Sequence, residues 1–401
     1  MGFNIWTDCE RRALPDILSF IVDNRGKTVP TDPDGNHILI ATNCVRNENL
    51  YPSYDKIRTL NEGTYQNWFR AHPIPGDILF VCKGTPGRCC MVPDPIDFCI
   101  AQDMVALRCD ESLVYNKYLL AVLRSNEIQS QITNTSVGDV IPHFKKSFFD
   151  QLLIPIPSLE VQKTIGDIYF WFCEKQEFNK KINENLLQQA RALFRKWFSI
   201  TSSGLYKLSD IADINPETYS PKENWSFVNY LDTSNITSGT INEVQYIIPS
   251  EEKLPSRARR ILRKDDVVFS TVRPNQLHYG IISNPKPNML GSTGFAVIRS
   301  KYETIPNEII YLALTESAFV EQMQQLAEQS VSTFPSIRPA DLDACVLPGP
   351  KEGDNDFMET IKALFNAVAT NNEENQRLAT LRDTLLPRLM SGELDVSSLD
   401  F

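Results

Sequence analysis

The chain has 401 residues, of which 42% are hydrophobic and 22% charged, so it is long enough to fold into two or three globular domains. Its formal net charge of -10 excludes a protein that is positively charged over its whole surface. A local basic face remains compatible with this charge, because binding to phosphates depends on the local potential.

Residues 1–157 predict a first domain of short strands and turns. Brief apolar runs such as Ile38-Leu39-Ile40 are bounded by Pro, Gly, Asn and Asp, which is typical of strands, and residues 116–130 have the period of a helix. Residues 158–203 then change to a long helical pattern and a linker. Apolar residues and one Asn recur there every seven positions, at Ile165, Phe172, Asn179, Leu186 and Leu193, with Ile168 and Ile182 on an adjoining seam.

The stretch from 74 to 94, IPGDILFVCKGTPGRCCMVPD, contains glycines, a lysine and three cysteines. A P-loop has its Lys after the second Gly, whereas Lys83 precedes both Gly84 and Gly87, which argues against a nucleotide site. The cysteines lack the paired spacing of a zinc site, so we expect no metal. Nine cysteines, with no signal peptide and no membrane-spanning run, predict reduced thiols in a cytoplasmic protein.

Residues 204–350 repeat the first domain about 190 positions later, and a helix is predicted at 306–329. The run Gly76-Asp77-Ile78-Leu79-Phe80 matches Asp265-Asp266-Val267-Val268-Phe269, and Leu153–Pro157 matches Val346–Pro350. The loops that follow the matched strands differ in sequence. The repeat therefore indicates two domains of one fold with different specificities.

Residues 351–401 predict a second long helix and a tail. One heptad position has Ile361, Val368 and Asn375, and another has Leu364, Asn371, Leu378 and Leu385. The Asn residues either form buried pairs that set the register or are solvated. We expect an α+β fold with two duplicated mixed α/β domains, separated by two long helices that pair as an antiparallel coiled coil with pseudo-twofold symmetry.

Together these features resemble the specificity subunit of type I restriction-modification systems. The resemblance covers nearly the whole chain. One departure is that the second repeat lacks the Leu-Glu-x-Gln sequence found at Leu159–Gln162, which leaves the start of the second long helix undefined. The matching segments are Asn24–Thr28, Gly76–Phe80 with its following loop, Ile141-Pro142, Leu153–Gln162, Ala190–Phe198 and Leu381–Leu394.

The resemblance implies that residues 1–157 and 204–350 are target recognition domains, each for one half of a split double-stranded DNA sequence. The long helices would set the spacing and bind two methyltransferase (M) subunits, with restriction/translocase (R) subunits in the full complex and no membrane. The chain itself would be non-catalytic and without a cofactor, and S-adenosylmethionine would bind to the M subunits, which methylate adenine. The expected spacer and partner-binding residues are Ile165, Phe172, Leu186, Leu193, Ile361, Leu364, Val368, Leu378 and Leu385.

Loop residues with hydrogen-bond donors are the candidate DNA contacts, since such side chains bind base edges and phosphates. A solvated surface charge is the alternative for each basic residue. The run from 253 to 264 has six basic residues in twelve and is the best candidate for phosphate contacts. The candidates are Arg25, Lys27, Asn43, Lys83, Thr85 and Arg88 in the first domain, and Arg257, Arg259, Arg260, Arg273, Asn275, Gln276 and His278 in the second.

Two other functions stay open from the sequence. The chain could be a solitary or truncated specificity protein that acts as an inhibitor or exchange partner. It could also be a scaffold whose duplicated domains bind protein, in which case it would lack affinity for DNA.

Overall fold

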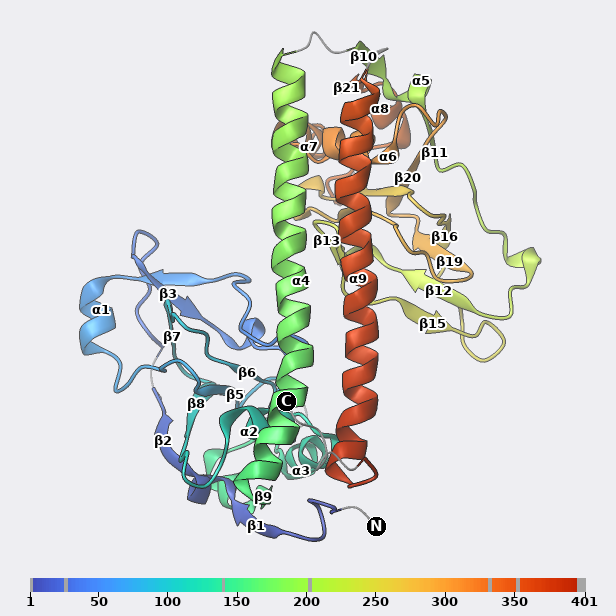
Figure 1. Cartoon of the computed structure of the whole chain (residues 1–401). Coiled ribbons are helices and arrows are strands. Elements are labelled where there is room, and N and C mark those ends of the chain that lie inside the picture. The colour runs from blue at the N-terminus through green and yellow to red at the C-terminus, as the bar shows by residue number, and fades with distance from the viewer. Residues whose placement is uncertain are drawn as a thin grey trace. The chain divides into compact units, whose positions relative to one another are not determined.

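The computed structural model has two compact units. It describes residues 3–24, 28–138, 141–200, 204–330, 334–350 and 354–394. The first unit consists of Met1–Lys180 and Glu373–Phe401, and the second of Lys181–Asn372. Each unit contains a mixed domain of sheets and short helices together with segments of two long helices (Figure 1).

The first unit has two main sheets. A four-stranded antiparallel sheet has the order β2-β8-β5-β6, and a three-stranded sheet has the order β4-β3-β7, with β3 parallel to β7. The strands are β1 Glu10–Ala13, β2 Leu18–Val22, β3 His37–Ile40, β4 Arg58–Leu60, β5 Ile78–Val81, β6 Cys89–Met91, β7 Phe98–Ile100, β8 Met104–Cys109 and β9 Leu153–Ile156, which pairs with β1. The helices are η1 Leu14–Ile17, η2 Thr42–Cys44, α1 Glu62–Asn67, α2 Asn116–Leu123, α3 Asn126–Thr135 and η3 Lys146–Gln151, where η denotes a 3-10 helix.

The second unit has two four-stranded sheets, of orders β11-β20-β17-β18 and β15-β12-β19-β16, with β12 parallel to β19. The strands are β10 Gly204–Lys207, β11 Ala212–Ile214, β12 Val228–Leu231, β13 Ile236–Thr237, β14 Thr240–Ile241, β15 Gln245–Ile247, β16 Ala258–Ile261, β17 Val267–Ser270, β18 Tyr279–Ile281, β19 Met289–Ser292, β20 Phe295–Ser300 and β21 Val346–Gly349. The helices are α5 Leu208–Ile211, η4 Pro221–Glu223, η5 Thr233–Asn235, η6 Pro274–Gln276, α6 Asn307–Leu314, α7 Ser317–Glu328 and α8 Pro339–Asp343.

The topology confirms the predicted duplication. The sheet β2-β8-β5-β6 corresponds to β11-β20-β17-β18, and the parallel pair of β3 and β7 corresponds to that of β12 and β19. The single helix predicted in each repeat is wrong, because α2 and α3 are separate helices, as are α6 and α7. In the first unit the break has a local cause: the Ser125 hydroxyl accepts a hydrogen bond from the Ile128 N–H and so caps a new helix.

The apolar runs that the two repeats share are strands buried on both faces. In β5, Ile78 and Phe80 pack into the core formed with α2 and α3, whereas Leu79 and Val81 pack into a second core with β3 and β7. Successive side chains of a strand point to opposite faces, so only a continuous apolar run can fill two cores. The matching strand β17 is likewise fully buried.

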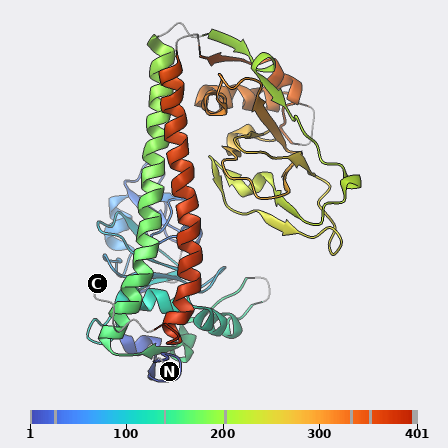
Figure 2. The same cartoon turned by 45° about the vertical axis from the view of Figure 1, so that its right-hand side comes forward.

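The two predicted long helices are confirmed and lie side by side in both views (Figures 1 and 2). In the second unit the Asn183 amide donates to the Asn372 side chain over 2.9 Å, and the rings of Trp197 and Phe357 stack with centroids 4.4 Å apart. The contacts therefore move to lower residue numbers in the second helix as the residue number rises in the first, so the two segments pair antiparallel. The helices are α4 Leu159–Ile200 and α9 Asn355–Met390.

The buried stripe of α4 differs in part from the predicted seam. Its second buried row passes through Tyr169, Gln176 and Asn183, so the predicted seam through Ile182, which is exposed, is wrong. Towards the end of the helix Phe194 is buried in place of Leu193. A helix with 3.6 residues per turn drifts by about 20° per heptad against a strict seven-residue repeat, which explains this shift.

The other predicted helix positions are largely covered within their own units. Half-buried positions at the seam are expected for a two-helix pair, since no third helix covers it. Buried are Ile165, Phe172, Ile361 and Leu378, and half-buried are Leu186, Leu364, Val368 and Leu385.

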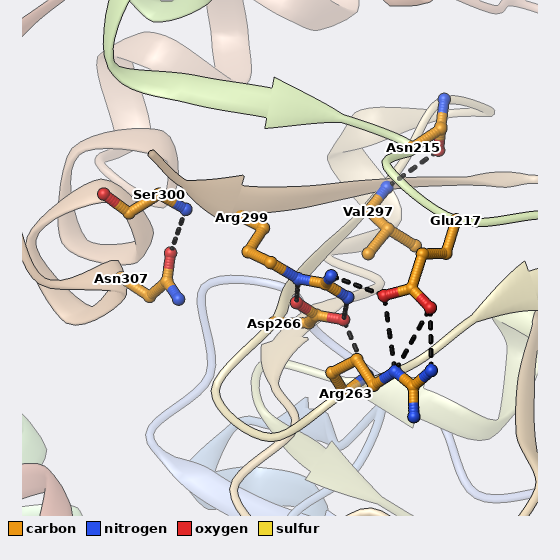
Figure 3. A network of polar contacts seen from close by, with 8 residues as sticks. All are labelled: Asn215, Glu217, Arg263, Asp266, Val297, Arg299, Ser300 and Asn307. Atoms are coloured by element: carbon orange, nitrogen blue, oxygen red, sulfur yellow. Dashed lines mark hydrogen bonds and ion pairs between the residues drawn. The ribbon is translucent and has the colours of Figure 1, made fainter. Parts of the chain in front are cut away.

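A buried ion pair is duplicated as well. Asp77, which precedes β5, accepts two hydrogen bonds of 3.0 Å from Arg108 of β8. In the second unit Asp266 accepts the equivalent bonds from Arg299 over 2.7 and 2.9 Å (Figure 3). Arg299 also donates to Glu217 in that unit, at 2.6 Å. A bidentate pair of this kind fixes the start of one strand against its neighbour.

Candidate nucleic-acid interface

Three loops of the first unit are held together by backbone hydrogen bonds, and we call them the first three-loop site: residues 82–88, 101–103 and 141–145. The Cys82 N–H donates to the Asp103 carbonyl over 2.8 Å, and the Phe144 N–H donates to the Cys82 carbonyl over 2.9 Å. The Gly84 N–H donates to Pro142, also over 2.9 Å. Loops pinned in this way present their side chains from a defined backbone.

The second unit repeats these bonds in the second three-loop site, residues 271–277, 293–294 and 334–338. The Thr271 N–H donates to the Gly294 carbonyl over 2.8 Å, and the Ile337 N–H donates to the Thr271 carbonyl over 2.9 Å. The Arg273 backbone N–H donates to the Pro335 carbonyl over 3.0 Å. The backbone frame is therefore the same at both sites, while the side chains on it differ.

The first three-loop site borders a basic hollow of about 570 Å³. Lys83 and Lys145 are exposed on it and form no ion pair with a described residue. Lys146, by contrast, pairs with Asp23. Free ammonium groups beside amide and imidazole groups suit a phosphate backbone. The lining residues include Lys83, Gln102, Asp103, His143, Lys145 and Lys146.

The remaining candidates of the first unit lie in different settings. Thr85 is exposed and Arg88 half-buried on the same loop as Lys83. Asn43 is exposed on η2, and its amide donates to the Asp55 carbonyl over 2.7 Å, which leaves its side-chain oxygen free to accept. Arg25 and Lys27 lie outside the described residues.

The second three-loop site has a strained arginine at its tip. Arg273 has φ 48° and occupies the position of Gly84, whose φ is 88°. A side chain in this left-handed region costs free energy, and such outliers cluster at functional sites. The guanidinium lies 5.1 Å from the centre of the Phe334 ring and is exposed, as are Asn275 and Gln276.

His278 has a partly structural role. Its Nδ1 lies 2.6 Å from the Ile236 carbonyl oxygen, so this nitrogen has the proton and donates. Only Nε2 then remains for an outside partner, and in the neutral ring it is an acceptor.

The basic residues of the run from 253 to 264 differ in their surroundings: one is held by an internal ion pair, and others lie at the surface. Arg263 is held by Glu217 at 2.8 Å and is not available (Figure 3). Arg257 is exposed just before β16, and Arg259 and Arg260 are half-buried within it. The buried Nε of Arg260 has no hydrogen-bond partner among the described atoms, and burial lowers the pKa of this side chain. An arginine without a carboxylate partner is suited to an external anion.

The cysteines that follow β5 are core residues rather than ligands. Cys89 and Cys90 are buried in β6. Burial raises the pKa of Cys99 and of Cys109 to about 12, so these groups are neutral thiols at physiological pH. The described part of the chain has no group of three His, Cys, Asp or Glu side chains able to hold a metal ion.

Comparison with known proteins shows what the chain is similar to. A family model described as "Type I restriction modification DNA specificity domain" matches residues 10–188, which include the first three-loop site. Residues 10–188 therefore match the type I restriction modification DNA specificity domain, and the chain is similar over most of its length to specificity subunits of type I restriction enzymes. It is 24% identical over 307 residues to the "Type I restriction enzyme MjaIX specificity subunit" of Methanocaldococcus jannaschii, with 71% of each chain covered.

Two further similarities extend over more of the chain. It is 22% identical over 398 residues to the "Type I restriction enzyme HindI specificity subunit" of Haemophilus influenzae, with 80% of this chain and 86% of the other covered. The crystal structure of the type I restriction-modification S subunit from M. genitalium covers 96% of both chains with a TM-score of 0.57 at 15% identity, which shows a shared fold. Within the described ranges of the chain, no helix combines the length and apolar character needed to cross a membrane.

Several polar residues of the hollows were absent from the sequence-based candidates. Gln102 and Lys145 border the first hollow, and Asn235 and Gln245 border one in the second unit. Gln102 lies two residues beyond the last residue of β7, and Asn235 follows β12, so both lie past the carboxyl ends of parallel strands, where ligands bind in many folds. The repeat signalled these strands, but it did not reveal which pairs are parallel.

Proposed function

We propose that the two domains of this specificity subunit each recognise one half of a bipartite DNA sequence. The observation that supports this most is the duplicated three-loop site, where one backbone frame presents Lys83, Gly84 and Thr85 in one unit and Val272, Arg273 and Pro274 in the other. Two readers with a common frame and unlike side chains would bind two different half-sites in one orientation.

The long helices α4 and α9 set the distance between the half-sites in this proposal and also bind the M subunits. Trp171 and Phe178 support a docking role for α4. They are 56% and 52% exposed, and they lie seven residues apart on one face of the helix. Exposed aromatic side chains are enriched at protein interfaces.

The chemistry belongs to the partners in this proposal. The specificity subunit is non-catalytic, and two M subunits bring S-adenosylmethionine to the target adenine, which they take out of the base stack. R subunits join the same assembly for restriction.

An exchange of domains tests the proposal. Residues 1–157 are replaced by the corresponding domain of a relative with another target, and the methylated sequences are mapped with the same M subunits. One half of the motif should change while the other half and the gap stay the same. If both halves changed together, separable recognition would be wrong, and if the chain bound no DNA in the presence of M subunits, the DNA-binding function itself would be wrong.

A further inference from the structure

The second unit contains a polar hollow outside the second three-loop site. It has a volume of about 460 Å³ and lies at the edge of the sheet β15-β12-β19-β16 where the parallel strands β12 and β19 end. Residues from three segments border it: the turn after β12, the start of β15 and the residues before β16. The polar lining residues are Tyr230, Asp232, Ser234, Asn235, Gln245 and Arg257.

One wall of this hollow is fixed by internal hydrogen bonds. The Tyr230 hydroxyl donates to Asp232 over 2.7 Å, and the other carboxylate oxygen of Asp232 accepts from the Ser234 N–H and hydroxyl over 3.1 and 3.0 Å. The Asn242 N–H donates to the Asn235 carbonyl over 2.8 Å. The turn η5 is therefore rigid, and a side chain on it is presented in a defined direction.

The opposite walls have side chains with unused donors. Gln245 lies directly across from Tyr230 in the pairing of β12 with β15, so both side chains are on the same face of the sheet. The side chains of Asn235, Gln245 and Arg257 form no hydrogen bond or ion pair with any described residue. The hollow thus has two amides and a guanidinium whose hydrogen-bonding groups are available to an outside ligand.

We propose that this hollow recognises base edges of the half-site bound by the second domain, an inference that rests on the proposed function. A carboxamide is both donor and acceptor, which is the pattern that adenine N7 and N6 require in the major groove, so Asn235 and Gln245 each bind an adenine. Arg257, exposed at the rim and followed by Arg259 and Arg260, binds the adjoining phosphate.

The first unit supports a difference in specificity at the equivalent place. There the turn after β3 is also a 3-10 helix, η2, but it has Asn43 and the buried Cys44 where η5 has Ser234 and Asn235. The amide of Asn43 is already bonded to the Asp55 carbonyl. The same turn therefore presents a free amide in the second domain only.

The test uses isosteric substitutions in the full chain with its M subunits. Wild type, Asn235→Asp and Gln245→Glu are each used to select from a pool of duplex DNA with randomised positions, and the bound sequences are compared. Asn284→Asp, in the loop between β18 and β19, is the control, because it makes the same change of charge at an exposed amide outside the hollow and outside the long helices.

We expect each of the two variants to lose roughly 5-fold to 100-fold preference for adenine at one or two positions of a single half-site, with some gain of cytosine, whose amino group donates to a carboxylate. The other half-site and the control motif should not change. An unaltered motif in both variants overturns the inference, and so does an equal loss of preference in both half-sites. A wild-type complex that selects no bipartite motif would instead refute the proposed function.

Discussion

Asn179 of α4 donates a hydrogen bond of 2.9 Å to the side chain of Asn375 in α9, and both lie on the helix seam of the first unit. The Asn179 side chain is 1% exposed, so the two Asn residues form a buried pair. The other interpretation of the sequence, in which this Asn is solvated, is therefore wrong. A second amide, Gln176, donates to the Asn375 carbonyl over 2.8 Å. A slip of either helix by one turn would leave these buried groups unbonded, so the pair favours one register.

The register allows a deletion that tests whether the helices set the gap. Removal of 180–186 from α4 and 368–374 from α9 keeps Asn179 opposite Asn375 and shortens each helix by roughly 10 Å. Base pairs stack about 3.4 Å apart, so the preferred gap should shrink by up to about three base pairs, with unchanged half-sites. Methylation is measured on DNAs that differ only in gap length, and an active shortened complex with the old gap would show that other parts set the spacing.

The buried ion pairs should be strong determinants of stability. Asp77 is 2% exposed, so Arg108→Met leaves an unpaired buried carboxylate and should lower the free energy of unfolding by about 3 kcal/mol. Urea denaturation of the subunit measures the loss. The double variant Asp77→Asn with Arg108→Gln removes both charges and should recover part of it, whereas a double variant as unstable as Arg108→Met would contradict the role of the unpaired charge.

Glu217 should make stability depend on pH. Hydrogen bonds from Arg263 and Arg299 lower the pKa of its carboxyl from 4.5 to about 2. A depressed pKa contributes stability that is complete above pH 4.5 and is lost as the pH falls towards 2. Glu217→Gln should therefore lower the Tm at pH 7, and its difference from wild type should narrow below pH 4.5. The exposed Glu252→Gln is the control, and a difference that does not vary with pH would contradict the assignment.

Arg273 should contribute to DNA binding while its left-handed backbone lowers the stability of the folded protein. Arg273→Gly relieves the left-handed backbone and should be more stable than Arg273→Ala by about 1 kcal/mol, since Ala retains the strain. Both variants lack the guanidinium and should bind DNA about equally weakly. Thermal unfolding and titration of a duplex with the target measure the two effects, and normal binding by either variant would remove Arg273 from the interface.

Arg259 and Arg260 of β16, together with Arg257 just before this strand, should bind phosphates, and this binding should weaken as the salt concentration rises. The triple variant Arg257→Ala, Arg259→Ala, Arg260→Ala should bind all sequences more weakly and reduce the slope of log affinity against log salt by up to about 2.7, near 0.9 for each phosphate that is no longer neutralised. Titrations at several salt concentrations on target and unrelated duplexes provide the slopes. A changed sequence preference with the wild-type slope would place these arginines at base edges.

The sequence by itself determined the architecture of this protein, because that architecture depends on local patterns. Apolar runs such as Val267-Val268-Phe269 mark strands buried on both faces, and a seven-residue period marks the long helices. The duplication was visible because equivalent strands bury equivalent residues, so their patterns persist where the loops diverge.

Only the tertiary structure decided which side chains meet. The Phe144 N–H reaches the carbonyl of Cys82, which lies far away in the chain, and Gln245 faces the same hollow as Asn235 because β15 pairs with β12 in one register. The direction of a side chain on a strand follows from that pairing, and the free or bonded state of an amide follows from what lies beside it. These interactions join segments that are distant in sequence, so no local period contains them.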